Sequence, residues 1–100
     1  MSYEMLVGLK IKDPEQYQAY REAMAPILSK FGGGFRYDFW VRETLKSESA
    51  SPIDRVFTIY FKDKTAMEAF FSHEEYLQIK ERFFLNSVEA TTIMASYQLN

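Results

Sequence analysis

The chain has 100 residues, the length of about one domain, so residues 1–100 are predicted to form a single domain. Lys and Arg number 12 against 14 Asp and Glu, and the net charge of −2 argues against nucleic acid as a partner. Hydrophobic residues make up 47% and charged residues 26% of the chain, which is the composition of a packed globule and excludes a disordered chain.

Cysteine and histidine usage limits the possible cofactors. The sequence contains no Cys and a single His, so disulfides and thiolate metal sites are excluded and an imidazole zinc site has too few ligands. We therefore expect no metal and no other cofactor. No apolar stretch is long enough to span a membrane, and Met1 is not followed by a signal segment, so a cytoplasmic protein with no membrane partner is expected.

The first predicted elements are a strand and a helix. Apolar and polar residues alternate over residues 3–11 with the period of two that is typical of a strand. Asp13 can then cap a helix, Pro14 suits its first position, and Gln16 can complete a capping box. A helix is therefore predicted to begin directly after Asp13.

An apolar stripe and three glycines define the rest of this helix. Apolar residues recur at three- and four-residue steps up to Phe31, and the glycines at 32–34 end the helix because they accept a left-handed conformation. Pro26 removes one backbone hydrogen bond, which predicts a kink or a break near Met24.

Two strands are predicted in the middle of the chain. The first runs from Phe35 to about Leu45 and alternates aromatic with charged residues. Residues 46–53 are rich in Ser and form an exposed loop. Residues 55–61 are apolar on both faces, which indicates a central strand covered on both sides.

The C-terminal part is predicted to contain a split helix and a last strand. Asp63 is a second helix cap, and this helix stops near Ser72. Ser72 and Glu75 have the spacing of another capping box, so the chain restarts as a helix through Phe83. Residues 91–97 alternate again and predict the fourth strand.

The order β-α-β-β-α-β predicts a ferredoxin-like α+β fold, with a four-stranded antiparallel sheet and both helices on one face. Strand alternation assigns to the helix-covered face Met5, Val7, Leu9, Phe35, Tyr37, Phe39, Phe57, Ile59, Ile93 and Ala95. It assigns to the opposite face Glu4, Leu6, Gly8, Lys10, Arg36, Asp38, Trp40, Arg42, Val56, Thr58, Tyr60 and Met94.

The face without helices predicts an assembly. Trp40 and Tyr60 alone would expose roughly 300–500 Å² there, and the aliphatic residues take the total beyond the largest patch of a typical monomer. A second copy of the sheet, packed face to face about a two-fold axis, would cover this surface. We therefore expect a homodimer with Trp40 and Tyr60 at its interface.

Short motifs along nearly the whole chain resemble a known group of proteins. They are Asp13-Pro14-Glu15 with Tyr17 and Tyr20, Lys30-Phe31-Gly32-Gly33, Arg55-Val56-Phe57, and Phe71 followed five residues later by Tyr76. In this order and spacing they resemble the dimeric α+β barrel superfamily and, within it, the DUF1330 family of domains of unknown function.

The resemblance implies that two sheets close into a barrel across a homodimer, with helices outside and a small-molecule pocket between sheet and helices or at the subunit interface. Related barrel families include monooxygenases and isomerases that need no metal. Many family members carry Arg-Gly-Gly in the second strand, where this chain has Asp38-Phe39-Trp40. No role of that arginine is carried over, because Arg36 and Arg42 do not occupy the matching position.

Three residues are candidates for catalysis. His73 could act as a general base, or it could simply be a half-exposed residue at a helix start. Asp38, between arginines, could bind or deprotonate a small polar substrate, or it could belong to an interface ion-pair set. Tyr17 lies on the apolar helix face, where it is core or brings a phenol to a cavity. An Asp38 kept ionised would orient the substrate, which leaves His73 or Tyr17 to move a proton.

Candidate ligand-binding residues on the second and third strands are Arg36, Asp38, Trp40, Arg42 and Tyr60. Two functions follow. One is a cofactor-free enzyme, monooxygenase- or isomerase-like, for a small organic molecule; it needs a cavity reached by a titratable group. The other is a non-catalytic dimeric module that binds small molecules or regulates, with the seam between sheet and helices filled solidly by Trp40, Tyr60 and Phe side chains.

Two other functions fit the residues poorly. A phosphate-binding loop runs from a strand into a helix, whereas the glycines at 32–34 lead from a helix into a strand. RNA-recognition domains share the element order, but their third strand needs Gly and aromatic residues where this chain has Val56, Thr58 and Ile59.

Overall fold

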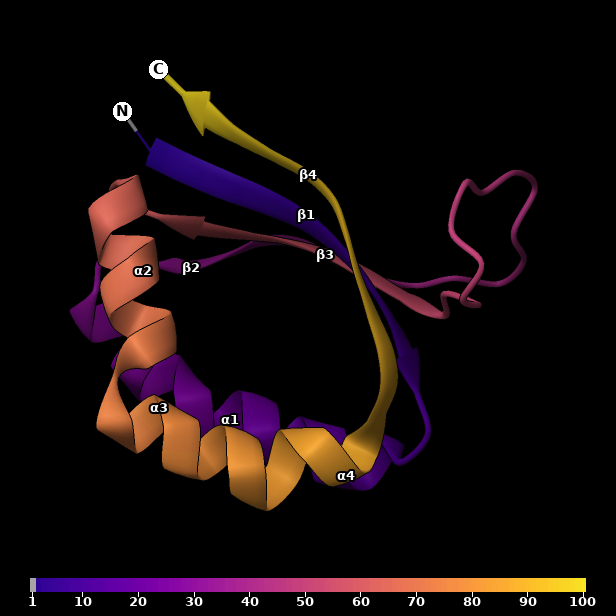
Figure 1. Ribbon diagram of the computed structural model, residues 1–100, viewed down its shortest axis with the longest axis horizontal. Coiled ribbons are helices and arrows are strands. Elements are labelled where there is room, and N and C mark those ends of the chain that lie inside the picture. The colour runs from indigo at the N-terminus through magenta and orange to yellow at the C-terminus, as the bar shows by residue number, and fades with distance from the viewer. Residues whose placement is uncertain (1) are drawn as a thin grey trace.

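The computed structural model describes residues 2–100 and places the helices across one face of an antiparallel sheet (Figure 1). In chain order the elements are β1 (Ser2–Ile11), α1 (Pro14–Lys30), β2 (Gly34–Trp40), β3 (Arg55–Phe61), α2 (Lys64–Ser72), α3 (Glu74–Ile79), the π-helical turn η1 (Lys80–Phe84), α4 (Leu85–Ser87) and β4 (Val88–Leu99). The four strands lie in the order β2-β3-β1-β4. The predicted ferredoxin-like α+β fold is thus confirmed.

The core lies between the sheet and the helices. Apolar residues from β1 and β3 alternate toward the helices, and the buried stripe of α1 packs against them. The most deeply buried large side chains are Leu9, Tyr17, Met24, Leu28, Phe61 and Phe70. No helix within residues 2–100 is long and apolar enough to cross a membrane.

Helix starts follow the predicted chemistry at two positions. The Asp13 carboxylate accepts from the Gln16 backbone N–H at 3.1 Å, and the Asp63 carboxylate accepts from the Ala66 N–H at 2.7 Å. These bonds satisfy amide donors that have no partner inside the helix. The predicted break near Met24 is wrong, because α1 continues through Pro26. Pro26 is exposed and costs one hydrogen bond, while the stripe on both sides of it stays buried.

The end of α1 needs glycine. Gly32 has φ +69°, and its N–H and that of Gly33 donate to Ser29 and Leu28 at 3.0 Å each, the pattern of a Schellman motif. A Cβ on Gly33 would lie 2.7 Å from the backbone oxygen of Tyr60. The helix can therefore turn directly into the edge strand β2.

The prediction for β2 is wrong in length and partly wrong in its faces. The strand ends at Trp40, and a register shift between Phe35 and Tyr37 inserts one extra residue opposite β3. Such a bulge reverses the alternation beyond it. Tyr37 therefore pairs with Thr58 on the open face, while Asp38 pairs with Phe57 on the helix-covered face.

The same reversal moves two more residues. Phe39 pairs with Val56 and lies on the open face, whereas Trp40 pairs with Arg55 and lies on the helix side. The predicted positions of Tyr37, Asp38, Phe39 and Trp40 are therefore all on the wrong face. A bulge leaves no simple signal in an alternating sequence.

Two smaller differences occur in the C-terminal half. In β4 a register shift leaves Met94 unpaired and puts Ala95 opposite Leu6 on the open face, so the predicted position of Ala95 is wrong too. The capping box at Ser72 is also wrong. The Ser72 hydroxyl donates back to the Glu68 carbonyl at 2.8 Å, and the next residue caps α3 instead.

The segment between β2 and β3 projects from one end of the sheet (Figure 1). Asp54 anchors its return, because its N–H donates to the Leu9 carbonyl and its carboxylate accepts from Lys10 Nζ at 3.1 Å and from the Ile11 N–H at 2.9 Å. Ile53 covers Gly8, where an added Cβ would lie 2.8 Å from Ile53 Cδ1.

Candidate functional site

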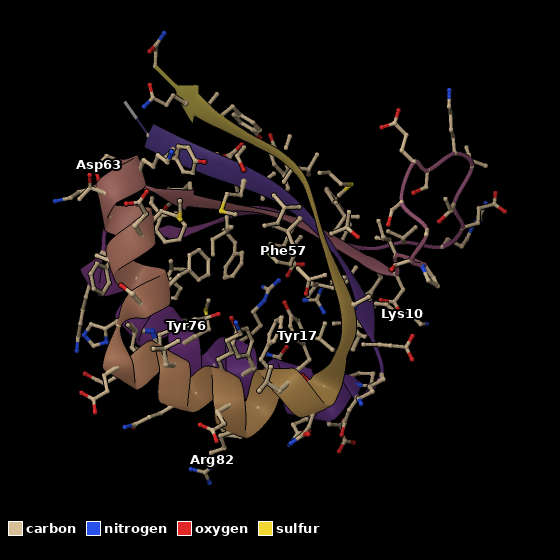
Figure 2. The ribbon with its side chains drawn as sticks, in the orientation of Figure 1. Lys10, Tyr17, Phe57, Asp63, Tyr76 and Arg82 are labelled. Carbon is tan, nitrogen blue, oxygen red and sulfur yellow. The ribbon has the colours of Figure 1, made fainter. Side chains whose placement is uncertain are left out.

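A cavity of about 450 Å³ lies between the sheet and the helices. Its sheet wall is apolar and includes Met5, Val7, Leu9, Phe57 and Ile59. Strand β4 adds the hydroxyl of Thr91, and the other polar groups come from the helices and from η1: Tyr17, Tyr20, Arg21, Tyr76 and Lys80. Figure 2 shows Tyr17 and Tyr76 on the inner side of the helical layer, facing the sheet, whereas Arg82 points away from the body. The cavity therefore has a largely apolar sheet wall, whereas its phenols and cations lie on the helical side.

Two tyrosines form a hydroxyl pair at the cavity. Tyr20 of α1 and Tyr76 of α3 bring their hydroxyl oxygens within 2.9 Å, so one phenol donates to the other. Burial raises the pKa of both phenols, and for Tyr20 the proximity of Tyr76 adds to the rise. Both groups are neutral near pH 7, and the pair keeps one O–H hydrogen that is not used between its two members.

A third phenol is held by an arginine. Arg21 lies one turn after Tyr17 in α1, and its Nε donates to the Tyr17 hydroxyl oxygen at 2.8 Å. The guanidinium carbon of Arg21 lies 3.9 Å from the ring centre of Phe35 and 4.7 Å from that of Phe57. Burial raises the pKa of Tyr17 although the charge and hydrogen bond of Arg21 lower it. The oxygen of Tyr17 is thereby fixed as an acceptor, which leaves its own hydrogen as a donor.

Asp38 is tied to two arginines behind this phenol. Its carboxylate accepts from Arg55 Nε at 2.7 Å and from Arg55 Nη2 at 2.8 Å, and from Arg21 Nη1 at 3.1 Å. Desolvation raises the pKa of Asp38, but the hydrogen bonds and charges of Arg55 and Arg21 outweigh it and lower the pKa overall. Asp38 is therefore ionised and a weak base.

Lys80 contributes a further cation to the lining. It starts η1, in which the Leu85 N–H donates to the Lys80 carbonyl across five residues instead of four. π-helical turns of this kind are rare and occur often at functional sites. Among residues 2–100, Lys80 Nζ has no carboxylate within 4.0 Å.

Of the predicted catalytic candidates, Tyr17 lines the cavity and Asp38 supports it through Arg21. His73 lies apart from them, between α2 and α3, and does not belong to the lining residues. Its Nδ1 accepts from the Glu75 N–H at 3.2 Å, and its ring lies 5.5 Å from that of Phe31. His73 therefore has a capping role in this structure.

The predicted ligand-binding residues do not form one group. Asp38 and Trp40 lie on the helix side, with Trp40 against Arg55 at 4.6 Å. Arg36 and Tyr60 lie together on the open face, where the guanidinium is 4.0 Å from the ring centre. Arg42 lies in the exposed segment after β2.

The open face carries its own polar cluster. Glu4 is 4% exposed although it is charged. It accepts from Arg36 Nε at 2.7 Å and from the hydroxyl of Tyr97. The Glu4 hydrogen bond raises the pKa of Tyr97. This cluster is separated from the cavity by the sheet.

The sequence pointed to Tyr17 but not to Tyr20, Tyr76, Arg21 or Lys80 as site residues. Tyr20 and Tyr76 fall on apolar helix faces, which is the pattern of core residues, and both are indeed buried. The η1 turn, which aligns Lys80 with the cavity, has no signature in the sequence. Within residues 2–100, no group of three or more His, Cys, Asp or Glu side chains is arranged to hold a metal ion.

The fold defines a ferredoxin-like α+β protein, and solved structures of this class are similar over nearly the whole chain. A protein of unknown function from Rhodopseudomonas palustris has 16% identity and a TM-score of 0.83, covering 99% of this chain and 82% of its own. The sequence pattern of the family described as a domain of unknown function, DUF1330, matches residues 3–97, so the chain belongs to this family.

Two further structures share the fold at lower similarity. SnoaB, a cofactor-independent oxygenase from Streptomyces nogalater, has 11% identity and a TM-score of 0.64, with 99% of this chain and 93% of its own covered. A dimeric protein of unknown function and ferredoxin-like fold from Bacteroides fragilis has 12% identity and a TM-score of 0.61, with 98% and 96% covered. No curated protein matches the sequence.

Proposed function

We propose that the protein is a cofactor-free enzyme, monooxygenase- or isomerase-like, that acts on a small organic molecule in the cavity between the helices and the sheet. The observation that carries the proposal is the cavity of about 450 Å³, which the side chains do not fill and which titratable groups reach. This volume falls in the range of about 300–1,000 Å³ typical of small-molecule sites. A solidly packed seam would have favoured a module without a ligand.

The chemistry that the site supports is stabilisation of a negative charge on the substrate. An isomerase and a cofactor-free oxygenase both act on a substrate anion. In the described part of the chain the lining offers no free base, so the substrate binds as the anion that it forms by losing a proton to water. In an isomerase this anion is reprotonated at another carbon, and in a monooxygenase O₂ oxidises it, with one oxygen atom entering the product and the other leaving as water. Neutral phenols and a cation beside an apolar wall are donors suited to such an anion. Tyr17 and the pair Tyr20–Tyr76 supply the phenols, and Lys80 supplies the cation.

Asp38 has a supporting part in this proposal. It holds Arg21, which in turn holds the oxygen of Tyr17, so its task is orientation and not proton transfer. Tyr17 is the group proposed to give or share a proton at the substrate. His73 is left out of the proposed site, because it lies outside the lining and its Nδ1 is engaged as a cap.

The similarity to SnoaB, a cofactor-independent oxygenase, supports the enzyme proposal at the level of the fold. The second candidate function is a non-catalytic module that binds small molecules, because the same cavity could hold a ligand without turnover. Both candidates keep the remaining sequence predictions: one domain, a cytoplasmic location, no cofactor, and no nucleic acid or membrane partner.

A homodimer belongs to the proposal as well. The open face exposes Tyr37 and Phe39 at 60% and 57% and Met94 at 42%, which is unusual for large apolar side chains. The dimeric ferredoxin-like protein from Bacteroides fragilis is similar over 98% of this chain. Packing of two open faces about a two-fold axis would cover these side chains.

A variant at the cavity edge tests the enzyme proposal. Ile93 lines the cavity and is 57% exposed, so Ile93→Trp should fill space without disturbing the core. Leu85→Trp is the matched control, because Leu85 is 56% exposed and does not line the cavity. Aromatic phenols and enolisable ketones are supplied as substrates, with O₂ uptake and C–H exchange in D₂O as readouts.

Turnover by the wild type and the control, and its loss in Ile93→Trp, would support the enzyme. Binding of the same compounds without O₂ uptake or exchange would favour the non-catalytic module. Turnover that is unchanged in Ile93→Trp would contradict the location of the site.

A further inference from the structure

We propose that the ligand of the cavity is an apolar molecule with one anionic group, and that Lys80 holds this group. The inference rests on the proposed function, since it names the ligand class for the same cavity. It depends on three observations: the charges that line the cavity, the hydrogen-bond donors left over in it, and the chemistry of the two walls.

The first observation is an unbalanced charge. Arg21 and Lys80 are the charged residues that line the cavity in the described part of the chain. The guanidinium of Arg21 is already engaged: its two Nη atoms bond to Asp38, at 3.1 Å and 3.4 Å, and its Nε bonds to Tyr17. Asp38 is also shared with Arg55, so this group carries one positive charge in excess. Lys80 is half-buried and lies in none of the ion pairs within residues 2–100. The net charge offered to a ligand is therefore positive.

The backbone directs Lys80 to the cavity. Its N–H donates to the carbonyls of Tyr76 and Leu77, so Lys80 stands one turn after Tyr76. In the wider turn of η1, residues four apart share a side of the helix, and Lys80 and Phe84 both line the cavity. Arg82, between them, points away from the body (Figure 2). In this short turn Lys80 therefore lines the cavity, whereas Arg82 points into solvent (Figure 2).

The second observation is an excess of donors. The oxygen of Tyr17 accepts from Arg21, which leaves the Tyr17 hydrogen free to donate. Tyr20 and Tyr76 use one of their two hydroxyl hydrogens between themselves, which leaves the other. No carboxylate belongs to the lining, because Asp38 lies behind Arg21. Such a site suits an anion or strong acceptor and disfavours a cation.

The third observation is the separation of the walls. The sheet wall offers Val7, Leu9, Phe57 and Ile59 and one hydroxyl, that of Thr91 in β4, whereas both cations and the phenols lie on the helices and η1. A ligand with a flat apolar body against the sheet and a carboxylate or phenolate toward the helices satisfies both walls. The cavity, at about 450 Å³, has room for a bicyclic ring system.

A pair of probes that differ in charge tests the inference. 2-Naphthoate is an anion at pH 7, and 2-naphthamide is its neutral counterpart of nearly the same shape. Calorimetric titration of the protein with both compounds should show about tenfold tighter binding of the naphthoate, since hydrogen bonds to charged groups are about twice as strong as neutral ones. The Arg82→Gln variant, which removes a cation from the solvent side of η1, should keep this preference.

Two variants at Lys80 decide whether it is the group responsible. Lys80→Gln should bind both probes with equal affinity, and Lys80→Arg should retain the preference for the anion. Equal binding of the two probes by the wild type would overturn the inference and leave the proposed cavity intact. A preference that survives in Lys80→Gln would overturn the assignment to Lys80. Failure of both probes to bind would count against the proposed function itself.

Discussion

The two faces of the sheet differ in how they are completed. The helix-covered face is closed by the chain itself, and its buried residues are almost all apolar. The open face exposes Tyr37 and Phe39 at its β2 edge, yet it buries the charged Glu4 under Arg36 and Tyr97. One face thus provides a core and a ligand cavity, whereas the other leaves large aromatic side chains exposed, which suits contact with another protein surface.

Strand β2 contributes to both faces, and its bulge decides which of its residues lie on each face. Beyond the register shift after Phe35, alternate residues point to opposite sides: Asp38 meets Arg21 of α1, and Phe39 faces outward. One short strand therefore supplies an ion pair that supports the cavity and aromatic surface for the proposed dimer. Variants in this strand can separate the two roles.

The largest expected effect is on the packed end of the helix-covered face. Phe70 is fully buried, and its ring centre lies 4.5 Å from that of Tyr76 and 5.0 Å from that of Phe71. Phe70→Ala should lower the free energy of unfolding by about 3–5 kcal/mol. Leu77→Ala is the control, because Leu77 is 45% exposed and should change stability by less than about 0.5 kcal/mol. Denaturant titration measures both; a small effect at Phe70 would contradict the packing.

The second prediction concerns the open face. Phe39→Lys should shift the protein from dimer to monomer in sedimentation at micromolar concentration, because a lysine at an apolar interface costs several kcal/mol unless it is paired. Trp40→Lys is the matched control one residue further on, and it should leave the dimer intact because Trp40 lies on the helix side. A dimer that responds to Trp40→Lys and not to Phe39→Lys would return the interface to the face predicted from simple alternation.

Sequence reasoning succeeded where one local signal determines the structure. Alternation places β1, a run that is apolar on both faces places β3, and the carboxylates of Asp13 and Asp63 cap the expected helices. It failed where an extra residue enters a regular element. The bulge in β2 reverses the faces of Asp38 and Trp40, and the η1 turn presents Lys80 to the cavity. Such insertions are set by long-range packing, which a local pattern does not record.

The cavity could not be predicted from the sequence for the same reason, since it too depends on long-range packing. Tyr17 was expected to be core or to bring a phenol to a cavity, and it is both buried and part of the cavity lining. The distance between Tyr20 and Tyr76, which are 56 positions apart, depends on how α1 packs against α3. Composition could predict aromatic packing there but not the space left inside it.

The third prediction separates the ion pair behind the cavity from the dimer. Asp38→Asn should lower the free energy of unfolding by about 1 kcal/mol at pH 7, a modest loss because 31% of the side chain is exposed to screening solvent. The pKa of Asp38 is lower in the folded state, so its contribution is present above the ordinary carboxyl pKa of 3.8 and is lost as the pH falls through the lowered value. Stability curves of the two proteins should therefore converge in acid.

Binding of 2-naphthoate to the same Asp38→Asn variant tests its supporting role. The variant should bind more weakly than the wild type while sedimenting as the same species, because Arg21 loses the partner that holds it against Tyr17. Equal ligand-induced stabilisation of the two proteins in thermal unfolding would remove Asp38 from the site. Loss of the dimer in Asp38→Asn would instead make it an interface residue.

The smallest expected effect is at the hydroxyl pair. Tyr20→Phe keeps the ring and removes the hydrogen bond to Tyr76, which should cost about 1 kcal/mol of stability at pH 7. Burial raises the pKa of Tyr20 well above its usual 10.0, so in alkali the unfolded chain releases this proton before the folded one does. The contribution of the Tyr20 hydroxyl is therefore complete below pH 10 and is lost as the pH rises toward the raised value. The stability of Tyr20→Phe should approach that of the wild type in this range.

Phe84→Leu is the control variant. The ring of Phe84 lies 5.0 Å from that of Tyr20 and does not titrate, so the difference in stability between Phe84→Leu and the wild type should stay constant with pH. A constant difference for Tyr20→Phe as well would show that the phenol of Tyr20 ionises equally easily in the folded and unfolded states, and would contradict its burial beside Tyr76.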